Sequence, residues 1–161
     1  MSKTHDGFTL IELVVVLILI GISVALVAPT IAHSLGQAQF RKDIRSVSAM
    51  LTLARSQAIT HKIPYAFSID INERMIWINP YQQERGEPPK RITQSPLSHT
   101  DTLRVTAQTR ENTSGTHTLM FYPNGSSGGG TIQMARSGQE ETVEIKLNIV
   151  TGLATSTRSL N

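Results

Sequence analysis

The fold of this chain is decided by residues 8–28, which read FTLIELVVVLILIGISVALVA. Between Leu13 and Ala28, only Gly21 and Ser23 interrupt the bulky apolar side chains. A run this dense and long cannot lie on the surface of a small soluble domain. With its flanking residues it reaches the ~20 residues that a helix needs to span a bilayer. The run therefore predicts a membrane segment and argues against a purely soluble cytosolic protein.

The rest of the 161-residue chain has room for one modest domain and not for a multi-domain enzyme. The chain has no cysteine, which excludes a disulfide framework and a thiol nucleophile. Its net charge is +3, and the basic excess is concentrated between residues 36 and 62. A basic helix there could contact nucleic acid or anionic lipid headgroups, but a solvated face is the simpler interpretation.

Three interpretations compete for residues 1–32. A cleaved secretory signal has a shorter apolar core, of roughly 7–15 residues, and a small-residue cleavage site, whereas the best exit here is followed by Pro29. A plain transmembrane anchor has the right length but leaves Glu12 unexplained, because a carboxylate inside a membrane is costly unless it has a partner. Glu12 lies near one end of the run and could reach the membrane interface, so this alternative stays open.

The third interpretation comes from the residues around Glu12. A short polar leader ends at Gly7, Phe8 follows it, Glu12 stands four positions later, and the hydrophobic run continues without a charge. This stretch resembles the N-terminal signature of type IV pilins and of the pseudopilins of type II secretion systems. Gly21 and Pro29 stand where many members of this family have a helix-weakening glycine and proline.

The resemblance implies a defined processing route. A prepilin peptidase would cut between Gly7 and Phe8 and methylate the new amine of Phe8. Glu12 would then pair with the N-terminal amine of the adjacent subunit in a filament. The electrostatics agree, because a carboxylate among packed apolar helices needs a cation, and a neighbour's α-amine becomes available only after cleavage. Asp6 departs from the family pattern, which usually has a basic residue there, and the basic residues after the run oppose this orientation by the positive-inside rule.

After the apolar run, residues 33–62 predict an amphipathic helix. Apolar residues recur at steps of three and four, as on a helix face that packs on a sheet. The members of this stripe are Phe40, Ile44, Val47, Leu51, Ala54 and Ala58. The helix should end before Pro64, and Pro29 should bend or loosen its junction with the apolar part.

Beyond Pro64 the hydrophobic period changes to two, which is typical of strands. Residues 65–70 and 75–78 predict a hairpin, whereas residues 80–100 are rich in proline and polar groups and predict a variable loop. Further strands are expected at residues 102–107, 117–122, 131–135 and 142–149. The predicted fold class is α+β and type IV pilin-like, with a long N-terminal hydrophobic and amphipathic helix packed on an antiparallel β-sheet domain.

Three further stretches extend the resemblance. The sequence LARSQAI at residues 53–59 resembles the helix end of the pseudopilin H and FimT group, and FYPNGSSGGGTI at 121–132 with VTG at 150–152 resembles its C-terminal hallmark. Residues 125–129 also match the G-x-S-x-G pattern of serine hydrolases, but a strand is expected after them where that motif needs a helix. A glycine-rich connector between strands is the better interpretation. The histidines show no metal-ligand spacing, so neither a metal nor another cofactor is expected.

The resemblance implies a minor pseudopilin without enzymatic activity, which assembles at or near the tip of the type II secretion pseudopilus and helps to export folded proteins across the outer membrane. Its expected parts are a leader peptide (1–7), a transmembrane or filament-core helix (8–32), an amphipathic helix (33–62) and a periplasmic β domain (63–161). Its expected partners are other minor and major pseudopilins, prepilin peptidase, the inner membrane and the assembly platform of the secretion system.

Two alternatives remain. One is a minor type IV pilin of the FimT or FimU kind, acting in pilus assembly or DNA uptake. DNA-binding members of that kind would concentrate arginines after the C-terminal glycine, where this chain has only Arg158, so nucleic acid is not expected as a partner. The other is a periplasmic enzyme, anchored in the inner membrane, whose N-terminus only mimics the leader.

Overall fold

A computed structural model of the chain describes residues 9–81, 91–106, 115–136 and 141–160, without the side chains of residues 27–34, Glu141 and Leu160. One helix, α1, spans Leu10–His61, and eight strands follow it in this described part. The chain divides into two compact units, Met1–Ala38 and Gln39–Asn161. Residues of α1 belong to both units, and the one long N-terminal helix expected from the sequence is present.

The N-terminus of α1 has a side-chain cap. The backbone N–H of Glu12 donates to Thr9 Oγ1 at 3.3 Å, and the N–H of Leu13 donates to the Thr9 carbonyl at 3.2 Å. Thr9 and Glu12 have the spacing of a capping box, in which a hydroxyl satisfies a free N–H group of the first helical turn. The carboxylate of Glu12 also lies in the first turn, where the helix dipole favours negative charge.

The C-terminal part of α1 packs its apolar stripe into the core. All six predicted stripe residues are buried, with Val47, Ala54 and Ala58 at 0% exposure. The helix ends at His61, before Pro64, as predicted. Lys62 leaves the helix with a positive φ of 56°, a conformation that commonly ends helices.

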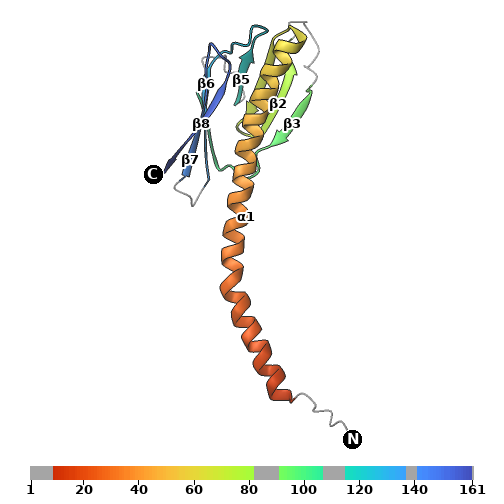
Figure 1. Cartoon of the computed structure of the whole chain (residues 1–161), viewed down its shortest axis with the longest axis vertical. Helices are drawn as coiled ribbons and strands as arrows, with labels where there is room; N and C mark the ends of the chain where they lie inside the picture. Colours follow the sequence, from red (N-terminus) through yellow and green to blue (C-terminus); the bar gives the residue numbers. More distant parts are fainter. Residues whose placement is uncertain (1–8, 82–90, 107–114, 137–140, 161) are drawn as a thin grey trace, which may run out of the picture. The chain divides into compact units, whose positions relative to one another are not determined.

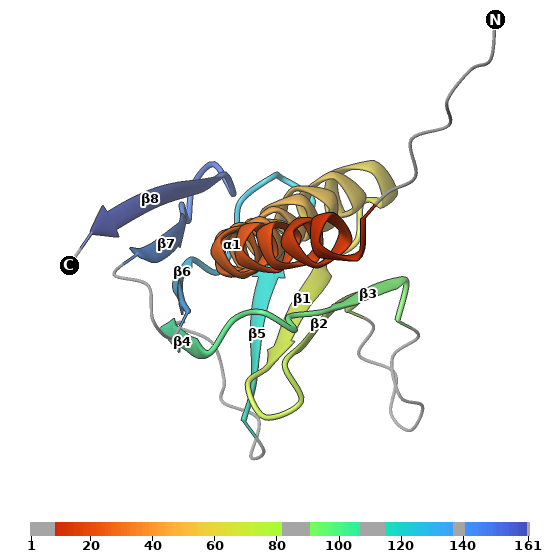
Figure 2. The same cartoon turned by 90° about the horizontal axis from the view of Figure 1, so that it is seen from below.

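The strands form two four-stranded antiparallel sheets (Figure 1). The first sheet has the order β3-β2-β1-β5 and consists of Thr93–Pro96, Met75–Pro80, Tyr65–Asp70 and Thr116–Phe121. The second has the order β4-β6-β7-β8 and consists of Thr102–Thr106, Gly130–Ala135, Glu141–Leu147 and Ala154–Leu160. In Figure 2 the second sheet lies to the left of the first.

The core lies where the stripe of α1 meets the inward faces of both sheets. Buried side chains of neighbouring strands lie opposite each other, so that Phe67 pairs with Ile78 in the first sheet and Ile132 pairs with Ile145 in the second. All four of these side chains are at most 1% exposed. Burial of this apolar surface stabilises the fold by about 25 cal/mol per Å² removed from water.

Two strands were not predicted from the sequence. The prediction of a loop over residues 80–100 is wrong for β3, and part of that range, residues 82–90, lies outside the described residues. The last strand, β8, was not predicted, because its sequence ATSTRSL lacks an apolar alternation. Both strands lie at sheet edges, where backbone pairing with one neighbour replaces side-chain burial as the stabilising interaction.

The β1–β2 turn is held by Asp70. Its Oδ1 accepts hydrogen bonds from the backbone N–H groups of Asn72 at 2.8 Å and Glu73 at 2.9 Å, and its Oδ2 accepts one from the Thr116 hydroxyl at 3.0 Å. The hydrogen bond from the Glu73 N–H is the largest cause that lowers the pKa of Asp70 below its ordinary value; burial opposes it, and the bonds from Thr116 and Asn72 add to the lowering. The charged carboxylate therefore joins this turn to β5.

Candidate assembly surface

The first described part of α1 exposes an apolar surface. Every large apolar side chain from Leu10 to Leu26 is between 41% and 81% exposed. Exposed apolar patches of this extent mark contacts with lipid or with another protein. Ser23 is a polar residue within this stretch, and its hydroxyl donates to the Leu19 carbonyl at 2.8 Å, which satisfies it within the helix. No helix in the described part of the chain is both long and apolar enough to cross a membrane.

Glu12 lies on this apolar surface. Its side chain is exposed, and among the described residues no ion pair to it is found. Gly7 and Phe8, the predicted cleavage and methylation sites, lie outside the described residues, so the predicted pairing of Glu12 stays a prediction. The backbone is helical at Gly21 and at Pro29, and their predicted weakening effect on the helix also stays a prediction.

A second feature joins the helix-end motif of residues 53–59 to the two motifs nearer the C-terminus. Arg55, on the amphipathic part of α1, donates from Nε to the carbonyl of Thr151 at 2.8 Å and to that of Gly125 at 3.2 Å. Gly125 lies in the β5–β6 loop, and Thr151 and Gly152 lie in the β7–β8 turn. A Cβ on Gly152 would lie 2.3 Å from the Gly125 carbonyl oxygen and 3.2 Å from Arg55 Cδ and Nε. The helix-end, FYPNG and VTG motifs thus meet at one half-buried arginine, which we call the Arg55 junction.

The β7–β8 turn at this junction is ordered by Asn148. The Asn148 Oδ1 atom accepts hydrogen bonds from the N–H groups of Val150 at 2.9 Å and Thr151 at 3.0 Å. The turn nevertheless exposes apolar side chains, with Val150 79% and Leu153 55% exposed. Sequence reasoning missed this surface, because only the structure shows that these residues cap a turn and do not continue a strand.

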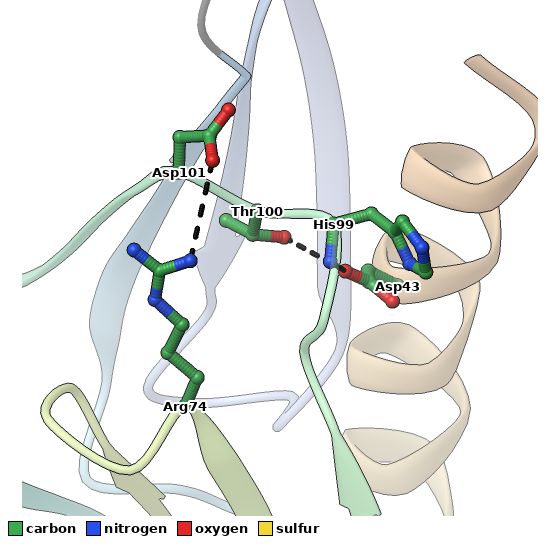
Figure 3. Close-up of polar contacts among 5 residues, drawn as sticks. All are labelled: Asp43, Arg74, His99, Thr100 and Asp101. Carbon is green, nitrogen blue, oxygen red and sulfur yellow. Dashed lines mark hydrogen bonds and ion pairs between the residues drawn. The ribbon is translucent and has the colours of Figure 1, made fainter. Parts of the chain in front are cut away.

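A third feature fastens the β3–β4 connection to the helix. Asp43 is only 4% exposed, and its Oδ2 accepts hydrogen bonds from the His99 backbone N–H at 2.8 Å and the Thr100 hydroxyl at 3.1 Å. Figure 3 shows both bonds, with the weaker ion pair of Arg74 and Asp101, at 4.0 Å, beside them. No local pattern predicts this role, because Asp43 stands in the sequence as a single acidic residue within the basic segment 36–62.

The G-x-S-x-G pattern belongs to a structural loop. Its central serine, Ser127, is 2% exposed; its hydroxyl donates to the Asn148 carbonyl at 2.9 Å and accepts from the Gly129 N–H at 3.1 Å. The loop connects β5 to β6, which confirms the interpretation as a connector between strands. A nucleophilic serine would instead stand on a strand-to-helix turn with its oxygen accessible. In the part of the chain that the structure describes, no group of three or more histidine and acidic residues could hold a metal ion.

Solved structures of other proteins have a similar fold. The fold is similar to the minor pseudopilin EpsH from the Type 2 Secretion System of Vibrio cholerae, with a TM-score of 0.54 and 16% identity over 76% of this chain and 97% of that one. It is also similar to the type IV minor pilin FimU of Pseudomonas aeruginosa, with a TM-score of 0.54 and 15% identity over 78% of this chain and 90% of that one. No curated protein sequence matches the chain.

Two family descriptions match the sequence itself. The prokaryotic N-terminal methylation motif matches residues 2–28, which include Gly7, Phe8 and Glu12. The family described as Type II transport protein GspH matches residues 43–151, which include Asp43 and the Arg55 junction. This second match spans more than half of the 161 residues, and the chain therefore belongs to the GspH family of type II transport proteins.

Proposed function

We propose that the chain is a minor pseudopilin that assembles at or near the tip of the type II secretion pseudopilus and helps to export folded proteins across the outer membrane. One observation carries the proposal: a helix with an exposed apolar surface leads into a domain of the GspH family. Such a surface must leave water, so it needs lipid before assembly and neighbouring helices afterwards. The work of the chain is assembly, and we assign no catalytic step to it.

Processing would couple to this assembly. In our proposal a prepilin peptidase cuts between Gly7 and Phe8 and methylates Phe8, and Glu12 then pairs with the α-amine of the adjacent subunit. The match of residues 2–28 to the methylation motif supports this order of events. Intact-mass measurement of the protein extracted from membranes tests it: loss of residues 1–7 and a gain of one methyl group are expected, and retention of residues 1–7 in cells with a working peptidase would contradict it.

The location follows from the same segment. We propose a single pass through the bacterial inner membrane by residues 8–32, with residues 63–161 in the periplasm. Other minor and major pseudopilins and the assembly platform would be its partners. Protease added to spheroplasts, whose inner membrane is intact, should therefore digest the β domain.

A substitution at Glu12 separates assembly from processing. Glu12→Gln removes the charge but not the cleavage site, so the variant should be cleaved normally, whereas secretion of exoproteins should fall sharply because the neighbouring amine loses its partner. Glu73→Gln, which removes an exposed carboxylate in the β1–β2 turn, is the matched control and should secrete normally. Equal secretion by both variants would refute the role of Glu12.

A minor type IV pilin is the second candidate function, because the fold is equally similar to that of FimU. Deletion of the gene, followed by complementation, distinguishes the two functions. The secretion proposal expects loss of exoproteins from the medium with normal twitching motility and DNA uptake. Normal secretion with loss of either pilus activity would favour the pilin.

A further inference from the structure

Three cations occupy one exposed face of α1 at the start of the folded unit. Arg41, Lys42 and Arg45 are all exposed. Because residues three and four apart are neighbours on a helix, Arg45 lies beside both of the others. The face they share is opposite the one that buries Phe40 and Val47. The three cations therefore form one patch, which we call the basic face.

Tertiary structure removes the nearest acid from this face. Asp43 lies between the three cations in the sequence, but it is buried, and its Oδ2 accepts the hydrogen bonds from His99 and Thr100. The ion pairs found among the described residues are Arg74–Asp101 and Lys146–Glu144, and neither involves the basic face. A segment that reads as mixed in the sequence thus presents three positive charges without a described counter-ion.

The position of the basic face selects the kind of partner. It follows in the sequence the exposed apolar side chains that end at Leu26. The long stems of arginine and lysine can lie on apolar surface while the charge reaches polar groups. Arginine binds phosphate oxygens in bidentate fashion, and lipid phosphates are the anions at the edge of an apolar phase.

We propose that the basic face binds anionic lipid headgroups and holds the folded unit at the membrane surface until the subunit is assembled. The inference rests on the proposed membrane anchoring of the chain. A carboxylate-rich surface of a partner protein is the competing occupant. It is the less favoured one, because the cations are exposed on the same helix that carries the apolar stretch, and we propose that this stretch anchors the chain in the membrane.

The test uses residues 33–161, which contain the whole unit Gln39–Asn161 and all of its core residues. Co-sedimentation with phosphatidylcholine vesicles, with and without phosphatidylglycerol, measures binding. The test variant is Arg41→Gln/Lys42→Gln/Arg45→Gln, and the control, with equal loss of charge, is Lys62→Gln/Arg104→Gln/Lys146→Gln. All six residues are exposed, and circular dichroism verifies that both variants are folded.

A cation near an anionic membrane strengthens binding about fivefold, so removal of the basic face should weaken binding to anionic vesicles on the order of a hundredfold. The control should keep most of its binding, and rising salt should weaken the wild-type interaction. Equal losses in the two variants, or equal binding to neutral vesicles, would overturn the proposal. So would a wild type that binds no vesicles but cross-links to other pseudopilins through the basic face. None of these results bears on the secretion phenotype, which the complementation experiment measures separately.

Discussion

Gly152→Ala is the substitution for which the structure makes the sharpest prediction. Gly152 has a φ of +62°, and its added Cβ would lie 2.3 Å from the Gly125 carbonyl oxygen, closer than van der Waals contact allows. That oxygen belongs to the backbone and already accepts a hydrogen bond from Arg55. Neither loop can move away without loosening the Arg55 junction.

The magnitude follows from two contributions. A left-handed backbone costs an alanine about 1–2 kcal/mol, and forcing an extra carbon into a packed site costs about 1–3 kcal/mol. The free energy of unfolding should therefore fall by about 2–5 kcal/mol, a large share of the roughly 5–15 kcal/mol that stabilises a typical domain. Urea unfolding of residues 33–161, followed by the fluorescence of the single tryptophan, Trp77, measures this loss.

Gly115→Ala is the matched control. Gly115 also has a positive φ, of +79°, but its added Cβ would meet the end of a side chain, the amide of Asn72, and not a backbone atom. Only the backbone cost should remain, about 1–2 kcal/mol. If the two alanine variants unfold at the same urea concentration, the close contact of Gly152 with Gly125 is not a constraint on the fold, and the reasoning fails.

Three further predictions concern polar contacts and use the same unfolding assay. Arg55→Met should lower the free energy of unfolding by about 2 kcal/mol, because two backbone carbonyls lose a charged donor. The control Arg45→Met, on the exposed face of the same helix, should change it by no more than ~0.5 kcal/mol. Equal effects of the two variants would argue against the Arg55 junction. Asp43→Ala leaves the His99 N–H and the Thr100 hydroxyl without their acceptor and should lower the free energy of unfolding by about 3 kcal/mol. Asp43→Asn keeps one acceptor oxygen and should lower it less. A larger loss for Asp43→Asn than for Asp43→Ala would contradict the assigned bonds. The lowered pKa of Asp70 means that its carboxylate contributes stability above its unfolded pKa, and that this contribution is lost as pH falls through the lower folded value. Asp70→Asn should therefore lose less stability than the wild type when pH falls below about 4, and parallel acid profiles would exclude this role.

Periodicity predicted the helix stripe and most strands, because the buried residues of those elements recur with the period of a helix or of a strand. Phe40 and Ala58 repeat with the period of a helix, and Phe67 and Ile69 repeat with the period of a strand. The edge strand β8 has no such pattern, since its pairing with β7 involves backbone groups that every residue has. The division of the strands into two sheets could not be predicted from the sequence pattern either, because strand order depends on contacts between residues that are distant in the sequence.

The candidate assembly residues divide in the same way. A single carboxylate in a long apolar run is unusual in any sequence, so Glu12 could be recognised without a structure. The junction of Arg55 with Gly125 and Thr151 joins residues 70 and 96 positions apart, and no local pattern reports such a contact. The apolar turn at Val150 depends likewise on the hairpin that positions it.

The sequence by itself determined the apolar segment, the stripe of α1 and the resemblance to pseudopilins, because hydrophobic spacing and a lone charge are local properties of a chain. Tertiary structure alone decided which charges face solvent. Lys42 and Asp43 are adjacent in the sequence, yet on the helix the lysine is exposed and the aspartate is buried. The β3–β4 connection supplies the hydrogen bonds of the buried aspartate. A buried carboxylate needs hydrogen-bond donors from elsewhere in the fold, and these are in place only after folding. Because Asp43 is buried in this way, it does not lie among the exposed cations, and the basic face of α1 stays positive.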